Sequence, residues 1–188
     1  MSIEKDLIEH FSGLDIPEKL LSLLRFDNEV AQSTYFSEGF EFSIDREKFG
    51  LKTYSEHEAF LDSIYEFACA DGSGSSYGFW LKDGNANLDV APIVTFGSEG
   101  GFHVVANNFN ELLQILTFDS EPMIDWDEVD YFKDPDDFEP SEKSKEYREW
   151  LKRVCGLEPI SNANDIVKKA QQEHKTSFDA WVANFYEG

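Results

Sequence analysis

The sequence predicts an α+β fold, with a central, mainly antiparallel sheet of three to five strands, helices packed around it and a helical C-terminus. Short apolar runs in the middle of the chain are separated by turns rich in Gly and Asp, which is typical of antiparallel strands. Segments with helical spacing of apolar residues lie on both sides of that region. The chain has 188 residues, of which 41% are hydrophobic and 15% aromatic. We therefore expect a single domain, residues 1–188, with a sizeable core.

Two short helices are predicted at the N-terminus. Leu7 and Phe11 fall on one face of the first helix, which ends at Gly13. Pro17 suits the first turn of the second helix, which carries several leucines. Apolar and polar residues then alternate over residues 40–44, and this period of two predicts a half-buried strand.

A third helix is predicted before the sheet region. Ser55 and Glu58 have the spacing of a capping box. The apolar residues that follow at helical spacing are Phe60, Ile64, Phe67 and Ala68. We therefore expect a helix that ends in the small-residue turn at residues 71–76.

Three strands are predicted next, over residues 77–81, 92–96 and 102–106. Asp83-Gly84 and the Gly-rich residues 97–101 supply the turns between them. Asn108, with Glu111 three residues further on, caps the helix that follows the sheet. The C-terminal region, residues 143–188, is expected to form three helices, over residues 147–154, 166–170 and 178–185.

The charge balance restricts the classes of partner. Acidic residues outnumber basic ones 38 to 16, which gives a net charge of −22. Such a chain repels phosphate backbones and anionic lipids, so we expect neither direct nucleic-acid binding nor membrane-surface binding. Residues 1–6 lack the features of a signal peptide, and we expect a cytoplasmic protein. Cys69 and Cys155 are too few for a disulfide framework, and nothing requires a bond between them.

Much of the acid lies in one segment, residues 119–142, which we call the acidic segment. It holds 11 acidic residues and one basic residue, Lys133, for a net charge of −10, where the average density of the chain gives about −3. Three prolines disfavour regular structure, yet four aromatic residues are interleaved with the acids. A solvated tail does not need aromatic residues, so we expect an ordered acidic loop with apolar anchors.

The region between the N-terminal helices and the acidic segment contains four pieces of sequence that match a known family in their order. The matching core is residues 67–116. Its pieces are Phe67-Ala68-Cys69-Ala70-Asp71-Gly72-Ser73-Gly74, Tyr77-Gly78-Phe79-Trp80-Leu81, Pro92-Ile93-Val94-Thr95-Phe96-Gly97-Ser98-Glu99-Gly100 and Val105-Ala106-Asn107-Asn108-Phe109-Asn110-Glu111-Leu112-Leu113. Their order is a helix, a turn with Asp and small residues, two strands, an acidic Gly turn, a strand and a helix. This order resembles that of the SUKH superfamily, which includes fungal cell-wall-assembly regulators and many bacterial immunity proteins.

The resemblance implies a non-enzymatic immunity protein, or antitoxin, that binds a cognate toxin domain and blocks it. Many such toxins act on nucleic acids and are basic where they grip phosphate, so we expect a basic toxin domain as partner of a monomer or weak dimer. The alternative is an intracellular scaffold or regulatory module of the same superfamily. The candidate contact residues are Asp119, Glu121, Asp125, Trp126, Asp127, Glu128, Asp130, Tyr131, Phe132, Asp134, Asp136 and Asp137. The competing interpretation is that this segment is only a solvated, charged surface.

Two turns carry the family motif, and both have a structural interpretation. Gly72 and Gly74 permit the backbone conformations of a tight turn, and Asp71 is placed to accept hydrogen bonds from nearby backbone amides. Glu99, in the second turn, is expected to be a surface acid.

Signals typical of enzymes and metal sites are incomplete. Residues 74–78 match Gly-x-Ser-x-Gly, but Ser76 lacks the preceding strand and following helix of a nucleophile elbow. The acids and amides over residues 83–89 have calcium-loop spacing, yet Leu88 and Val94 replace the required Gly and Glu. We therefore assign no catalytic residue, no metal ligand and no cofactor.

The four histidines are scattered along the chain. His10 and His174 are expected near helix C-termini, where partial protonation suits the helix dipole. His103 is expected on the solvent side of its strand.

Overall fold

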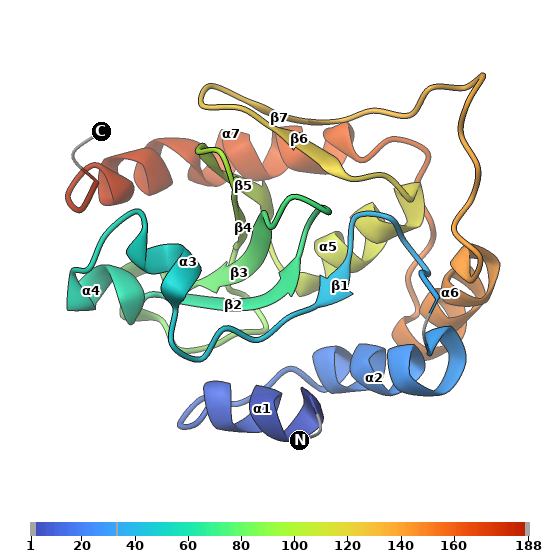
Figure 1. Ribbon diagram of the computed structural model, residues 1–188, viewed down its shortest axis with the longest axis horizontal. Helices are drawn as coiled ribbons and strands as arrows, with labels where there is room; N and C mark the ends of the chain where they lie inside the picture. Colours follow the sequence, from blue (N-terminus) through green and yellow to red (C-terminus); the bar gives the residue numbers. More distant parts are fainter. Residues whose placement is uncertain (1–2, 33, 187–188) are drawn as a thin grey trace.

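The computed structural model describes residues 3–32 and 34–186 and confirms the α+β fold (Figure 1). Five strands form an antiparallel sheet in the order β1-β2-β3-β4-β5, so each strand pairs with its neighbours in the sequence. They are β1 (Glu41–Phe42), β2 (Ile64–Cys69), β3 (Ser76–Trp80), β4 (Ile93–Phe96) and β5 (Phe102–Ala106). A second, two-stranded antiparallel sheet consists of β6 (Pro122–Ile124) and β7 (Val129–Tyr131).

Helices precede, interrupt and follow the strands. The α-helices are α1 (Ile3–His10), α2 (Glu18–Phe26), α3 (Phe49–Lys52), α4 (Glu58–Leu61), α5 (Phe109–Ile115), α6 (Ser144–Trp150) and α7 (Asn164–Val182). Shorter helical turns are η1 (Asp27–Ala31), η2 (Lys82–Gly84), η3 (Leu116–Phe118) and η4 (Leu151–Cys155). The predicted N-terminal helices and the strands β3, β4 and β5 are confirmed. So is the cap of α5, where the Asn108 side chain accepts a hydrogen bond from the backbone of Glu111.

The helix predicted before the first motif turn is wrong. Helix α4 ends at Leu61, and β2 begins at Ile64 and pairs with β1 and β3. A bulge between Glu66 and Ala68 interrupts the alternation of β2, so Phe67 and Ala68 are both buried. The apolar spacing therefore imitates a helix, although pairing on both sides makes the segment a strand.

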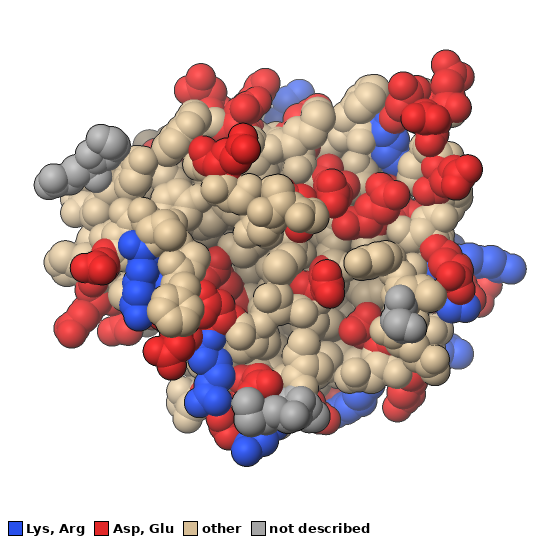
Figure 2. Space-filling model, in the orientation of Figure 1, with Lys and Arg blue, Asp and Glu red and all other residues tan. Residues whose placement is uncertain are grey.

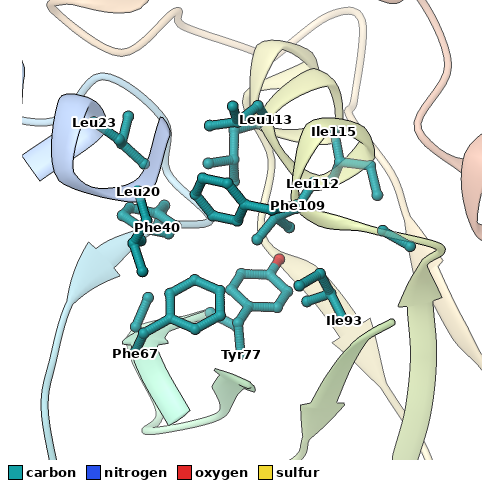
Figure 3. Packing of buried hydrophobic residues seen from close by; sticks show 14 of the residues in the cluster. Leu20, Leu23, Phe40, Phe67, Tyr77, Ile93, Phe109, Leu112, Leu113 and Ile115 are labelled. Atoms are coloured by element: carbon teal, nitrogen blue, oxygen red, sulfur yellow. The ribbon is translucent and has the colours of Figure 1, made fainter. Parts of the chain in front are cut away.

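The main sheet is covered on both faces. On β3, Tyr77 and Phe79 belong to one buried cluster, and Trp80 belongs to the other, as the period of two requires. Figure 3 shows the first cluster, in which leucines of α2 and α5 meet Phe67 and Tyr77 of the sheet. The second cluster joins the other face to α4 and α7. Figure 1 accordingly shows α1 and α2 on one side of the sheet and α7 on the other.

The C-terminal region contains fewer helices than predicted. The helix expected over residues 147–154 is present as α6 and η4, and Gly156 ends it with a φ of 66°. The two helices expected after it are a single 19-residue helix, α7. The residues between Ala170 and Phe178 are polar but include no Gly or Pro, so nothing interrupts the helix. None of the helices in the described ranges is both long and apolar enough to cross a membrane.

Candidate protein-binding surface

The acidic segment forms the β6–β7 hairpin and a following loop, whereas we expected a loop throughout. Pro122 pairs with Tyr131, and Ile124 pairs with Val129. Pro122, Val129 and Tyr131 are buried against the body of the protein, while Met123 is exposed. The hairpin crosses over α7 at the top of Figure 1. Because side chains alternate along its strands, the hairpin has an inner, apolar face and an outer face directed away from the body.

Asp119 does not belong to the exposed surface, so its prediction as a contact residue is wrong. The side chain is fully buried. Its Oδ1 atom accepts hydrogen bonds from the backbone N–H of Glu38 at 3.0 Å and from the Ser141 hydroxyl at 2.6 Å. Its Oδ2 atom accepts one from the Ser141 N–H at 2.8 Å. Asp119 therefore ties the two ends of the acidic segment to the body.

Tyr131 is likewise wrong as a surface anchor, because it is only 2% exposed. Its hydroxyl lies 2.7 Å from the hydroxyl of Tyr77, on β3 of the main sheet. Burial raises the pKa of the Tyr131 phenol, so the phenol stays protonated. The Asn164 side chain accepts a hydrogen bond from the Tyr131 N–H at 2.9 Å and donates one to its carbonyl at 3.1 Å. Tyr131 thus fastens β7 to the sheet and to α7.

Trp126 and Phe132 are exposed, as surface anchors must be, at 56% and 59%. Trp126 occupies the hairpin tip and packs on Gly100, where a Cβ atom would overlap the indole. Beside it, His103 Nε2 lies 2.7 Å from the carbonyl oxygen of Asp125. The predicted exposure of His103 is wrong, since the side chain is 3% exposed. Burial lowers the pKa of His103, so a neutral imidazole donates this hydrogen bond and holds the tip in place.

The acidic residues of the hairpin and the loop that follows point to solvent. Of the predicted contact residues, the exposed acids are Glu121, Asp125, Asp127, Glu128, Asp134, Asp136 and Asp137, and Asp130 is half-buried. Figure 2 shows acidic side chains gathered at the upper right, where Figure 1 places the loop after β7. In the described part of the chain, the segment's only ion pair is between Glu142 and Lys143, at 3.8 Å. Lys133 instead lies over the rings of Phe118 and Phe138, 4.3 Å and 3.9 Å from their centroids.

The two motif turns lie under this hairpin. The Asp71 Oδ1 atom accepts hydrogen bonds from three successive N–H groups, of Ser73, Gly74 and Ser75, each at 2.9 Å, which confirms its capping role. Burial raises the pKa of Asp71, but the hydrogen bonds from Ser75 and Ser73 outweigh burial and hold the pKa below its usual value. Gly74 adopts a φ of 103°, as the turn requires.

Contacts between turns and hairpin make one continuous surface. The Gly72 N–H donates to the Glu121 carboxylate at 2.9 Å, which joins the first turn to the hairpin. The hydroxyls of Ser73 and Ser98 lie 2.6 Å apart, which joins the two turns. Glu99 is exposed in the second turn, as expected. The motif turns therefore support the acidic segment through these hydrogen bonds.

Met123 and Asn164 were missed by the sequence reasoning. Met123 is 52% exposed and pairs with Asp130 on the outer face of the hairpin. A strand over residues 122–124 could have been found from the apolar residues there, but Pro122 and the surrounding acids favoured a loop. The role of Asn164 has no local signal, because its partner lies 33 residues away.

The enzyme-like and calcium-like signals have structural explanations. The Ser76 hydroxyl donates to the buried Glu66 carboxylate, and Ser76 begins β3, so a strand follows it where a nucleophile elbow needs a helix. The side chains of Asn85 and Asn87 each accept a hydrogen bond from the N–H two residues further on. No group of three or more metal-ligating side chains comes together within residues 3–32 and 34–186.

Two further histidines differ from expectation. His10 ends α1, but burial and the nearby Lys48 charge lower its pKa to about 4, so it is neutral at pH 7 rather than partly protonated. His174 lies within α7 rather than at a helix end, and burial lowers its pKa as well. Cys69 and Cys155 are both free thiols.

A scan of protein-family models, a search of curated proteins and a search of solved structures each returned no match to this chain. The resemblance to the SUKH superfamily therefore stays a prediction based on the order of its motifs. The structure departs from that order at one piece, because β2 stands where the motif order places a helix.

Proposed function

We propose that this chain is a non-enzymatic binding domain, an immunity protein that binds a cognate toxin domain through the acidic hairpin and its following loop. The observation that carries the proposal is the exposure of Met123, Trp126 and Phe132 in a segment whose acids over residues 121–137 make no ion pair within the described part of the chain. Aromatic residues and methionine are enriched at protein interfaces, whose rims are polar and solvent-accessible.

The negative charge of the acidic segment indicates that the partner has a positively charged surface. Within the described residues the acids over 121–137 make no ion pair, so their negative charge is left for a cationic surface to neutralise. Such complementarity speeds association, to about 10⁸–10⁹ M⁻¹s⁻¹ at low salt, and weakens as salt screens the charges. The partner that fits is a protein domain with a concentrated Lys and Arg surface.

A toxin that acts on nucleic acid has such a surface, because it must hold phosphate. An acidic hairpin seated there excludes the substrate by occupying its site and by repelling its charge. This mechanism needs no catalytic residue and no cofactor in the immunity protein. Inhibition is therefore expected to be stoichiometric and to weaken as the salt concentration rises.

The test is capture from a lysate of the source cells at low salt, followed by elution with salt. The expected result is one basic protein that salt releases and whose activity the chain blocks at a one-to-one ratio. A variant with Asp125, Asp127, Glu128 and Asp130 changed to the matching amides is expected to lose capture and the steep salt dependence.

The matched control changes four exposed acids that lie outside the acidic segment and alters the net charge equally. These are Asp15, Glu29, Glu47 and Glu56. The control is expected to capture the partner as well as the parent chain does. Equal loss in both variants would mean that only total charge matters, which would contradict the proposed surface. Capture of several unrelated housekeeping proteins would favour a scaffold over an immunity protein.

A further inference from the structure

A groove lies where the hairpin tip, the start of β5 and the C-terminal end of α7 meet, at the upper left of Figure 1. Its volume is about 470 Å³, and its aromatic walls are Phe102, Trp126 and Tyr186. We propose that this aromatic groove binds an arginine side chain of the basic partner. The inference depends on the proposed function and adds the chemistry of the anchor that the partner inserts.

The aromatic walls provide the π surface for a cation. Trp126 and Tyr186 are nearly parallel, at 26°, with ring centroids 6.0 Å apart. Phe102 meets both rings edge-on, 6.3 Å from Trp126 and 5.5 Å from Tyr186. Although it packs against these rings, Trp126 keeps more than half of its surface exposed. Tryptophan is the best of the aromatic side chains at binding a cation over its ring.

The Trp126 wall is held in position before any partner arrives. Gly100 packs directly against the indole, and His103 fixes the backbone at Asp125. A side chain held in this way has little rotational freedom left to lose on binding. The groove is therefore preorganised to receive a side chain of the partner and does not have to rearrange on binding.

The charges at the groove select a cation over an apolar side chain. Lys175 is already paired with Asp179, at 3.0 Å. Asp127 lines the groove, is exposed and makes no ion pair in the described part of the chain. His103 adds no positive charge, because burial lowers its pKa. The uncompensated charge at the groove is thus negative.

Arginine fits better than lysine on two grounds. Its planar guanidinium stacks on an aromatic ring, and its fork of N–H groups can pair with a carboxylate such as Asp127 at the same time. A lysine ammonium is a compact, strongly hydrated charge, and it gains less from a flat aromatic wall. The groove is therefore expected to discriminate between the two.

The test uses a defined probe, the peptide acetyl-(Gly-Arg)₄-amide, with acetyl-(Gly-Lys)₄-amide for comparison, at low salt. Binding is measured on the parent chain by NMR of the tryptophan indole N–H groups and by titration. We expect the arginine peptide to shift the Trp126 resonance and to bind more tightly than the lysine peptide. Trp126→Ala is expected to weaken binding of the arginine peptide about fivefold, and Asp127→Asn is expected to weaken it as well.

Phe49→Ala and Asp15→Asn are the matched controls, because both residues are exposed and lie outside the groove and the acidic segment. Each is expected to stay within twofold of the parent. Asp127→Asn leaves the indole in place and so keeps the test valid if Trp126→Ala disturbs the hairpin. Equal affinity for both peptides, or equal loss in groove and control variants, would overturn the inference. Peptide binding that is lost in the four-acid variant but unchanged in Trp126→Ala would reject the groove and leave the acidic surface standing.

Discussion

Replacing Asp119 by Ala removes a buried carboxylate that holds both ends of the acidic segment. Three hydrogen bonds are lost, and the backbone N–H groups of Glu38 and Ser141 lose their acceptor. Hydrogen bonds to a charged group contribute about 1.5–3 kcal/mol each but are not additive, so we expect a loss of about 4 kcal/mol in the free energy of unfolding. For a chain of this size, that loss lowers the melting temperature by about 10 °C.

Asp119→Asn refines the test. Asp119 has a φ of 60°, a conformation that Asn tolerates better than Ala does. Asn keeps one acceptor oxygen but places an NH₂ group where the other accepted a bond, so a loss of about 2 kcal/mol is expected. Urea and thermal unfolding of both variants measure these losses, with exposed Asp137→Ala as a control near zero. A loss below about 1 kcal/mol for Asp119→Ala would refute the claim that this residue closes the segment.

Two other predictions concern a buried acid and a buried histidine. Burial raises the pKa of Glu66 to about 6, and the Ser76 hydrogen bond offsets this only in part. Because the unfolded carboxyl has a pKa of 4.5, the folded chain holds more protons between pH 4.5 and 6, and stability falls as the pH rises through this window. Glu66→Gln is thus expected to raise the free energy of unfolding by about 2 kcal/mol at pH 7 and not at pH 4, as measured by urea unfolding. An equal increase at both pH values would contradict burial of the charge as the cause. His103→Ala removes the hydrogen bond to Asp125 and is expected to speed amide hydrogen exchange in residues 123–130 but not in β3. Unchanged exchange at the tip would show that His103 does not hold it.

The fold could be predicted from sequence wherever local signals agree with tertiary packing. The strands β3, β4 and β5 are separated by Gly turns, and the cap of α5 lies within four residues. The prediction failed at β2, where a bulge imitated helical spacing, and at α7, where a polar stretch looked like a break. In both cases the decisive contacts come from distant residues, which spacing along the chain does not reveal.

The residue composition of the candidate surface could be predicted from the sequence, but which of its side chains are buried could not. The concentration of acid and the exposure of Trp126 and Phe132 follow from the sequence pattern. Asp119 and Tyr131 have the same residue types as their exposed neighbours, yet their partners, Ser141 and Tyr77, lie 22 and 54 residues away. Only the three-dimensional contacts show which residues of the acidic segment are buried and hold it in place and which are exposed.

The two-sided hairpin has a consequence for how the protein can change its specificity. Pro122, Val129 and Tyr131 anchor the inner face, while Met123 and Asp130 are paired with each other on the outer face. Point substitutions at Met123 or Asp130 therefore change the chemistry of the outer face at little expected loss of stability. A hairpin divided in this way lets a lineage change its exposed surface by successive single substitutions, each of which leaves a folded protein.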